Sequence, residues 1–256
     1  MNLSYEPIKL NLETPFRIAH GTSHARHNVL VRIRSGGYEG VGEAAPVRQH
    51  HETQDSVLAY LAALPQDWTR LADPFMLEEI LAALPLGSQA ARAAIDVALH
   101  DLAGKILGLP LYRFLGLNPD RAPQTSITIG IGSEDEVRAN ARSAAGRFSI
   151  LKLKLDGDLE RSLTLVRVVR SVTSARLVAD ANCAWTVEQA LQIIPPLAEL
   201  GLEWIEQPLP EDDLAGLCRV RQVSSLPIFA DEPVRTACDI PRLAGCVDGV
   251  NIKVMK

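Results

Sequence analysis

Five charged side chains recur at a near-constant interval in the second half of this 256-residue sequence. They lie 26, 26, 25 and 22 residues apart, and each ends a short apolar run: Lys154, Asp180, Glu206, Asp231 and Lys253. Three carboxylates from successive strands can converge on one hard cation, and oxygen ligands without a nearby histidine or thiol favour Mg²⁺, or else Mn²⁺. We therefore predict a metal site at Asp180, Glu206 and Asp231. The structural alternative is that each carboxylate caps the helix that follows its strand.

The second of the apolar runs carries two lysines on one face. Lys152 and Lys154 alternate with Leu151, Leu153 and Leu155, and residues two apart on a strand point the same way. If helices cover the leucines, the lysines face inward, where their mutual charge, burial and a nearby cation lower the pKa of an ammonium group. A lysine in that setting can act as a base. A solvated lysine pair on an edge strand is the alternative.

Lys253 lies in the sixth run, GVNIKV, and we predict that its side chain also points inward. The second and sixth strands of an eight-stranded ring lie opposite each other, so Lys154 and Lys253 would face each other across the metal. Two bases on opposite faces suit removal and return of a proton beside a carboxylate, and a divalent ion stabilises the resulting charge. All six histidines precede residue 124, so no histidine base is predicted there.

The elements that would position these residues form a predicted parallel sheet. From residue 124 onward, six β-rich runs alternate with amphipathic helical stretches: TSITIGI, FSILKLKL, RLVAD, EWIEQ, LPIFAD and GVNIKV. One polar side chain per βα unit, at the carboxyl end of the strand, is typical of a (β/α) TIM-type barrel. No glycine-rich phosphate loop follows the first run, which argues against an open doubly wound sheet. Because a closed barrel needs about eight strands, we predict an α/β barrel truncated after strand six, as in a fragment.

We predict that residues 1–123 form a separate α+β domain and that residues 124–256 form the barrel domain. In the first of these, β-rich runs at 3–10 and 28–34 lead through Ser35-Gly36-Gly37 into YEGVGEA, which indicates a hairpin. Three helical patterns follow. The second is predicted to open at Asp73-Pro74 and to close before Pro85. The third carries apolar pairs every four residues from 90/91 to 106/107, a stripe that must pack against a large surface.

Composition narrows the classes of function. Lys and Arg number 26 against 31 Asp and Glu, and the net charge of −5 without a basic block predicts no nucleic-acid partner and no membrane surface. No signal peptide or membrane-spanning run is visible, so we predict a cytoplasmic protein with a small-molecule substrate, and we leave a homo-oligomer open. The four cysteines, Cys183, Cys218, Cys238 and Cys246, lack CxxC pairing and are predicted to be reduced and mostly buried.

The motifs together resemble the enolase superfamily, and within it the muconate-lactonizing subgroup, most of all the dipeptide epimerases related to L-Ala-D/L-Glu epimerase. The similar segments run in order along almost the whole chain: ALHDLAGKILGLPLYRFLG, KLK at 152–154, DAN at 180–182, EQP at 206–208, ADE at 230–232 and NIKVMK at 251–256. The resemblance implies an N-terminal capping domain and a Mg²⁺-dependent isomerase. It also implies metal ligands and bases at the positions reached from spacing, with Lys152 binding the substrate carboxylate.

Substrate specificity is less well defined by the resemblance. TIGI at 128–131 looks most like dipeptide epimerases and makes Thr128 a candidate substrate-binding residue. In the loop FRIAHGTSHARHN, which in the family belongs to the capping domain and closes over the site, His20-Gly21 stands where acidic-dipeptide epimerases often carry arginine, and Arg26 is the candidate substitute.

Three further interpretations stay open. DANCAW is similar to the o-succinylbenzoate synthases, which use the same lysines and metal for a dehydration, and a muconate cycloisomerase would use them as well. A third interpretation is an inactive fragment, because the last two strands of the family's barrel, with the acidic motif that often holds a dipeptide's amino group, are absent from this sequence.

Overall fold

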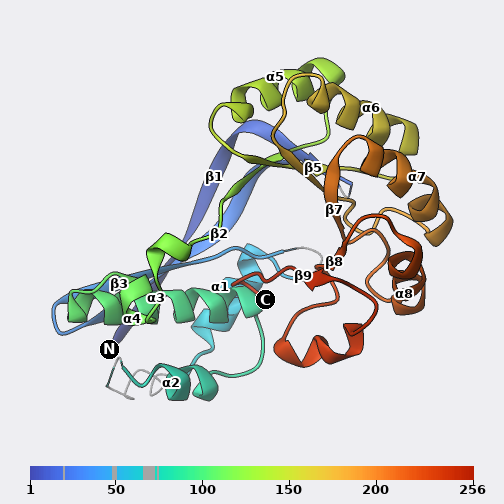
Figure 1. The fold of residues 1–256 in the computed structure, drawn as a ribbon. Coiled ribbons are helices and arrows are strands. Elements are labelled where there is room, and N and C mark those ends of the chain that lie inside the picture. The colour runs from blue at the N-terminus through green and yellow to red at the C-terminus, as the bar shows by residue number, and fades with distance from the viewer. Residues whose placement is uncertain (20, 48–50, 66–72, 74) are drawn as a thin grey trace. The chain divides into compact units, whose positions relative to one another are not determined.

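The computed structural model describes residues 1–19, 21–47, 51–65, 73 and 75–256. These residues form two compact units (Figure 1). The first unit comprises Met1–Glu13, His24–Ala122 and Lys253–Lys256, and the second comprises Thr14–Ser23 and Pro123–Ile252. Pro74 and His20 lie outside the described residues.

Three strands form the sheet in the order β1 (Asn2–Ile18), β2 (Gly21–Ser35) and β3 (Tyr38–Ala44). The predicted hairpin is confirmed, since β2 and β3 pair antiparallel with Ser35 opposite Tyr38. Gly36 and Gly37 form its two-residue turn with φ of 57° and 84°, the left-handed backbone that glycine adopts without steric cost. The strands extend beyond the predicted 3–10 and 28–34. The strand β1 contains two prolines, Pro7 and Pro15, and it is an edge strand, where a missing N–H is tolerated.

Four helices follow in the first unit: α1 (Gln54–Ala62), α2 (Leu77–Ala83), α3 (Gln89–Leu107) and α4 (Leu111–Phe114). The predicted start of the second helix is wrong, because α2 begins at Leu77 after Met76. Asp73 instead closes a turn, with its side chain accepting a hydrogen bond from the N–H of Phe75 at 2.9 Å. The predicted end before Pro85 is confirmed.

The long helix α3 packs closely on β3. Its buried stripe follows the predicted four-residue repeat and ends one turn before the last predicted pair: Ala90, Ala91, Ala94, Ile95, Ala98, Leu99, Leu102 and Ala103. A Cβ atom at Gly40 would lie 2.0 Å from the carbonyl oxygen of Ala98, and one at Gly42 would lie 1.9 Å from that of Ala94. The two glycines therefore allow helix and strand to approach backbone to backbone.

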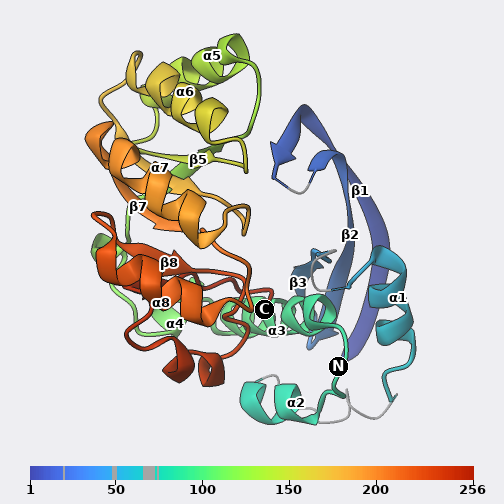
Figure 2. The ribbon, with the colours of Figure 1, turned by 90° about the vertical axis from the view of Figure 1, so that its right-hand side faces the viewer.

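The second unit contains a six-stranded parallel sheet in sequential order, as the sequence predicted. The strands and helices alternate: β4 (Ser126–Ile129), α5 (Glu134–Ala145), β5 (Ile150–Lys154), α6 (Leu159–Arg170), β6 (Arg176–Asp180), α7 (Val187–Glu199), β7 (Leu202–Glu206), α8 (Leu214–Val223), β8 (Ile228–Ala230) and β9 (Gly249–Val250). Figure 2 shows the four helices side by side along one face of the strands. Between β8 and β9, two short 3₁₀ turns, Ala237–Asp239 and Pro241–Leu243, stand in place of an α-helix. This shorter connection accounts for the interval of 22 residues between Asp231 and Lys253, against 25 or 26 for the others.

The alternation predicted for β5 is confirmed. Leu151, Leu153 and Leu155 are at most 2% exposed and belong to the apolar core shared with the helices. Lys152 and Lys154 lie on the other face of the strand, with 18% and 12% of their side chains exposed. The edge-strand alternative for the lysines does not hold, because β5 lies between β4 and β6.

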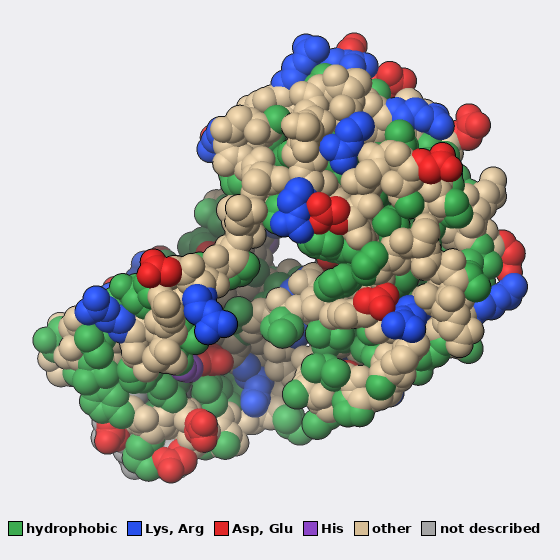
Figure 3. All heavy atoms as spheres, viewed as in Figure 1, with side chains coloured by type: hydrophobic (Ala, Val, Ile, Leu, Met, Phe, Trp, Pro, Cys, Tyr) green, Lys and Arg blue, Asp and Glu red, His purple; other side chains and the backbone are tan. Residues whose placement is uncertain are grey.

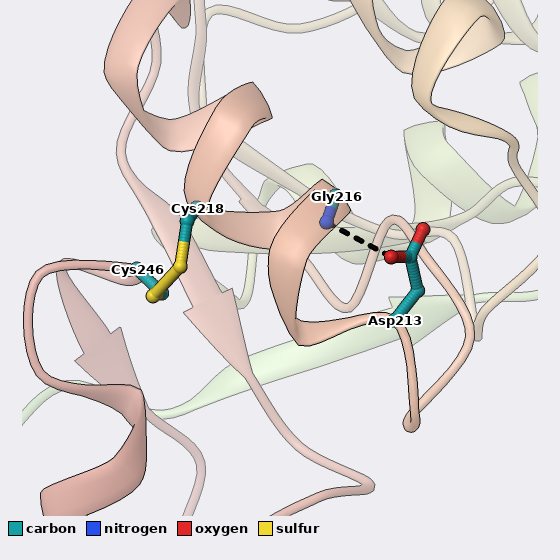
Figure 4. The surroundings of a disulfide bond; sticks show 4 residues. All are labelled: Asp213, Gly216, Cys218 and Cys246. Carbon is teal, nitrogen blue, oxygen red and sulfur yellow. Dashed lines mark hydrogen bonds between the residues drawn. A yellow bond between two sulfur atoms is a disulfide. The ribbon is translucent and has the colours of Figure 1, made fainter.

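A disulfide bond joins Cys218 on α8 to Cys246, which lies before β9 (Figure 4). The prediction that all four cysteines are reduced is therefore wrong for this pair. The two cysteines are 28 positions apart and carry no spacing motif, and only the packing of α8 beside the β8–β9 connection brings the two sulfur atoms together. Cys183 and Cys238 are free thiols, partly exposed and exposed respectively, so the cysteines are not mostly buried either.

Among the described residues, no helix combines the length and apolar character that a membrane span requires. Basic and acidic side chains are intermingled over α5 and α6 on the face of the molecule in Figure 3. This mixed surface agrees with the absence of a basic block in the sequence.

Candidate metal and proton-transfer site

Three carboxylates meet where successive strands of the parallel sheet end. Asp180 and Glu206 are the last residues of β6 and β7 and pair in register, and Asp231 directly follows β8. One oxygen atom from each lies within 4.8 Å of the others. The three residues are 1%, 5% and 0% exposed. The structure thus brings together the carboxylates that the sequence singled out.

Other residues cap the helices that follow these strands. The hydroxyl of Thr186 caps α7, and the carboxylate of Asp213 caps α8 by accepting a hydrogen bond from the N–H of Gly216 at 2.8 Å (Figure 4). After β8, Thr236 occupies the capping position of the 3₁₀ turn. The capping alternative for the three buried carboxylates therefore fails, and their burial needs another cause.

Both lysines of β5 donate hydrogen bonds into this cluster. The Nζ atom of Lys152 lies 2.6 Å from Oε2 of Glu206 and 3.1 Å from Oδ2 of Asp180. The Nζ atom of Lys154 lies 2.6 Å from Oδ2 of Asp180 and 2.8 Å from Oδ1 of Asn182. Because β5 and β6 pair with Lys154 opposite Asp180, the contact follows directly from the strand register.

The pKa values in the cluster reflect burial and an excess of negative charge. Burial and the charge of Asp180 raise the pKa of Glu206 to about 7, although Lys152 opposes the shift. Burial alone would lower the pKa of Lys152, but Asp180 and Glu206 outweigh it and raise that pKa. The predicted lowering of the lysine pKa rested on burial, the neighbouring lysine and a bound cation. Without a cation, the two carboxylates reverse the direction for Lys152.

The donor set fits a divalent cation. Three carboxylates carry more charge than the two lysines compensate, and burial beside Asp180 raises the pKa of Glu206 to about 7, so this carboxyl group binds a proton more readily than an exposed glutamate does. A bound cation would replace that proton. Oxygen donors with no histidine or thiol among them suit Mg²⁺ or Mn²⁺.

Two amide side chains that the sequence did not single out also bind this cluster. Asn182 accepts the hydrogen bond from Lys154, and its own N–H donates to Oδ1 of Asp180 at 2.9 Å. Asn251 donates from Nδ2 to Oε1 of Glu206 at 2.9 Å. Asn182 ends the motif DAN and Asn251 begins the motif NIKVMK, but neither spacing nor residue type predicted these contacts. Asn182 reaches Lys154 from a left-handed backbone with φ of 45°, which the sequence does not reveal.

Glu232, next to Asp231, places a fourth carboxyl group beside the cluster. Its Oε1 atom is 3.4 Å from Nδ2 of Asn182, and its Oε2 atom is buried without a hydrogen-bond partner. Burial raises the pKa of Glu232, and the negative charges of Asp231 and Asp180 raise it further.

Three sequence candidates remain: Thr128, Arg26 and Lys253. Thr128 is partly exposed on β4 and pairs in register with Lys152. Arg26 is exposed on β2, in the first unit. The prediction that Lys253 lies on the sixth strand is wrong, because β9 ends at Val250. Lys253 is exposed in the segment that groups with the first unit.

Two family models match the sequence. The model described as "Mandelate racemase / muconate lactonizing enzyme, N-terminal domain" matches residues 5–116. The model described as "Enolase C-terminal domain-like" matches residues 136–256.

Individual relatives agree with these matches. The chain is 40% identical to the L-Ala-D/L-Glu epimerase of Bacteroides thetaiotaomicron, over 100% of this chain and 67% of that protein. It is 36% identical to the L-Ala-D/L-Glu epimerase of Escherichia coli, over 96% of this chain and 74% of that protein. A crystal structure of the dipeptide epimerase from Enterococcus faecalis, complexed with Mg and the dipeptide L-Leu-L-Tyr, matches with a TM-score of 0.90 and 32% identity over 99% of this chain and 74% of that chain.

Proposed function

The chain belongs to the mandelate racemase/muconate lactonizing enzyme family of the enolase superfamily, and we propose that it is a Mg²⁺-dependent epimerase. Its substrate in this proposal is a carboxylate with a proton on the α-carbon, a dipeptide or an N-acylated amino acid. The observation that carries the proposal is the buried cluster in which three carboxylates and two lysines meet at the ends of neighbouring strands. Dipeptide epimerases among the relatives support the choice of substrate.

Asp180, Glu206 and Asp231 would hold the cation. When bound, Mg²⁺ supplies positive charge that stabilises the substrate carboxylate as the α-proton leaves. Lys154 takes that proton in this proposal, and the carbonyl oxygen of the Asn182 side chain holds its ammonium group in place. Lys152 lies beside it on the same strand face and binds the substrate carboxylate.

Three further roles rest on the sequence motifs. Lys253 is proposed as the second base, which returns a proton to the opposite face of the α-carbon. Thr128, in register with Lys152, and Arg26 are proposed to bind the substrate. A dehydratase or a cycloisomerase would use one lysine as the base and the other only to stabilise charge. Replacing each lysine in turn therefore distinguishes these reactions from epimerisation.

The test is exchange of the α-proton in D₂O, followed by proton NMR. A dipeptide library that includes acidic, basic and hydrophobic second residues supplies the substrate, and both epimers are given to Lys154→Met and Lys253→Met. Each variant should lose net inversion and keep exchange from one epimer only, because the cation and the other base remain. Lys105→Met, which removes a lysine bound to Asp101 in the first unit, is the control and should invert at the wild-type rate.

Loss of exchange from both epimers in both variants, or inversion at the wild-type rate in either, would exclude the two-base reaction. Elimination of water without inversion in the wild type would identify a dehydratase instead. No turnover of any substrate by a protein that binds Mg²⁺ would support the inactive fragment.

A cytoplasmic location and a small-molecule substrate as the main partner complete the proposal, and assembly into a homo-oligomer is the proposed quaternary state. Sedimentation velocity over a hundredfold range of concentration tests the assembly. Fractionation of cells that express the protein, with the activity assayed in each fraction, tests the location.

A further inference from the structure

Gln207, which directly follows the carboxylate Glu206, is completely buried and adopts a left-handed backbone with φ of 37°. Such a conformation is strained for a residue with a side chain and persists only where surrounding contacts enforce it. A buried amide adds a further cost unless its donor and acceptor are both satisfied. The contacts of Gln207 must therefore offset two costs.

The main chain of Gln207 joins three neighbouring strand ends. Its N–H donates to the carbonyl oxygen of Phe229 on β8 at 2.8 Å. Its carbonyl oxygen accepts from the N–H of Cys183, in the segment after β6, at 2.9 Å. Gln207 thus lies at the centre of the sheet edge at which Asp180, Glu206 and Asp231 end their strands.

The side chain of Gln207 holds the third carboxylate residue directly. Its Oε1 atom accepts a hydrogen bond from the N–H of Asp231 at 3.0 Å, and its Nε2 atom donates to the carbonyl oxygen of Leu209 at 2.7 Å. Because a carbonyl oxygen can only accept, Leu209 determines which end of the amide carries nitrogen and leaves the oxygen facing Asp231. Both bonds lie in the buried interior, where water does not compete for them.

We propose that Gln207 is a positioning residue for the metal site, which fixes the backbone of Asp231 so that its carboxylate points at Asp180 and Glu206. The inference rests on the proposed function, since it assumes that these carboxylates bind a cation. Neighbours of metal ligands that hold them by hydrogen bonds typically change metal affinity or activity 10- to 100-fold when they are replaced.

The test measures Mn²⁺ binding by electron paramagnetic resonance, without substrate, in Gln207→Asn. Asparagine tolerates the left-handed backbone better than glutamine does and keeps the amide, but it is one methylene shorter and cannot reach both Asp231 and Leu209. We expect a folded protein whose Kd for Mn²⁺ is raised about tenfold. Gln207→Met keeps the length of the side chain but has no amide, and should raise the Kd by a similar factor.

Gln189→Met is the matched control. The Gln189 side chain also bonds to backbone, accepting from the N–H of Thr186 at 2.9 Å, but it does so at the start of α7. This variant should lower the melting temperature and leave the Kd for Mn²⁺ unchanged. If Gln207 had a purely structural role, its variants would behave like this control, with a lower melting temperature and an unchanged Kd for Mn²⁺. That result in either folded Gln207 variant would overturn the proposal. If the wild type itself fails to bind Mn²⁺, the metal site and the proposed function fail with it.

Discussion

The contact between α3 and β3 in the first unit and the strand ends in the second unit place opposite demands on the side chains. At β3, Gly40 and Gly42 have no side chain at all, because the backbone of α3 fills the space that a Cβ atom would occupy. At the ends of β6 and β7, carboxylates are buried beside one another, which raises the pKa of Glu206 to about 7. The first arrangement favours folding, whereas the second disfavours the charged form of Glu206 until a cation binds.

This difference separates residues selected for stability from residues selected for chemistry. Natural proteins keep destabilising groups where activity needs them and compensate elsewhere. We therefore expect substitutions at β3 to cost stability, and neutral replacements of the buried carboxylates to cost metal binding.

The largest effect should come from Gly42→Ala. The new Cβ atom would lie 1.9 Å from the carbonyl oxygen of Ala94, so helix and strand must separate, and we expect a loss of about 4 kcal/mol or more. Urea denaturation measures the free energy of unfolding. The control is Gly146→Ala, at a position where a Cβ atom meets nothing within 4 Å, and it should change stability by about 0.5 kcal/mol or less. Similar losses for both would show that the close approach is not what stabilises the first unit.

Reduction of the disulfide should have the next largest effect. Cys218 and Cys246 are 28 residues apart, and a cross-link over such a loop contributes about 3 kcal/mol by restricting the unfolded chain. Dithiothreitol should therefore lower the melting temperature of the wild type and not that of Cys218→Ser. A thiol assay in denaturant without reductant should find only Cys183 and Cys238, and a count that includes the other two would contradict the bond.

Asp231→Asn should abolish most of the stabilisation by Mg²⁺. A cation whose free concentration is 100 times its Kd stabilises the folded state by about 2.7 kcal/mol. The loss of one of the three carboxylates should remove most of this stabilisation. Asp213→Asn makes the same chemical change at the start of α8, where asparagine caps equally well, and should keep the full Mg²⁺ effect. Differential scanning calorimetry with and without Mg²⁺ tests both.

The pH dependence of Mg²⁺ binding should show the smallest effect. Burial and Asp180 raise the pKa of Glu206 from 4.5 to about 7, so between these values the folded protein holds a proton that the unfolded chain has lost. The contribution of Glu206 to stability in the absence of metal therefore falls as pH rises through this window. Mg²⁺ must displace that proton, so below about pH 7 its Kd should weaken by up to about tenfold, or about 1.4 kcal/mol, per pH unit. Calorimetric titration from pH 5.5 to 8.5 measures this, and an equal Kd at both ends would exclude Glu206 as a ligand.

The sequence alone determined the parallel sheet and the residues at its ends. Alternating leucine and lysine on β5, together with one polar residue per βα unit, predicted which side chains share a face, because side-chain direction along a strand has a fixed period of two. The repeat of α3 and the glycines of the hairpin turn are equally local properties. Each depends on residues close together in the chain, so the sequence contains enough information to predict it.

Tertiary structure decided the rest, because it depends on residues that are distant in the chain. The disulfide between Cys218 and Cys246 has no local spacing signal, and the sequence did not place the end of β9 before Lys253. The raised pKa of Lys152 needs the charges of Glu206, 54 residues away, and of Asp180. The hydrogen bond from Asp231 to Gln207 depends on a left-handed backbone that neighbouring strands enforce, which residue type alone does not predict.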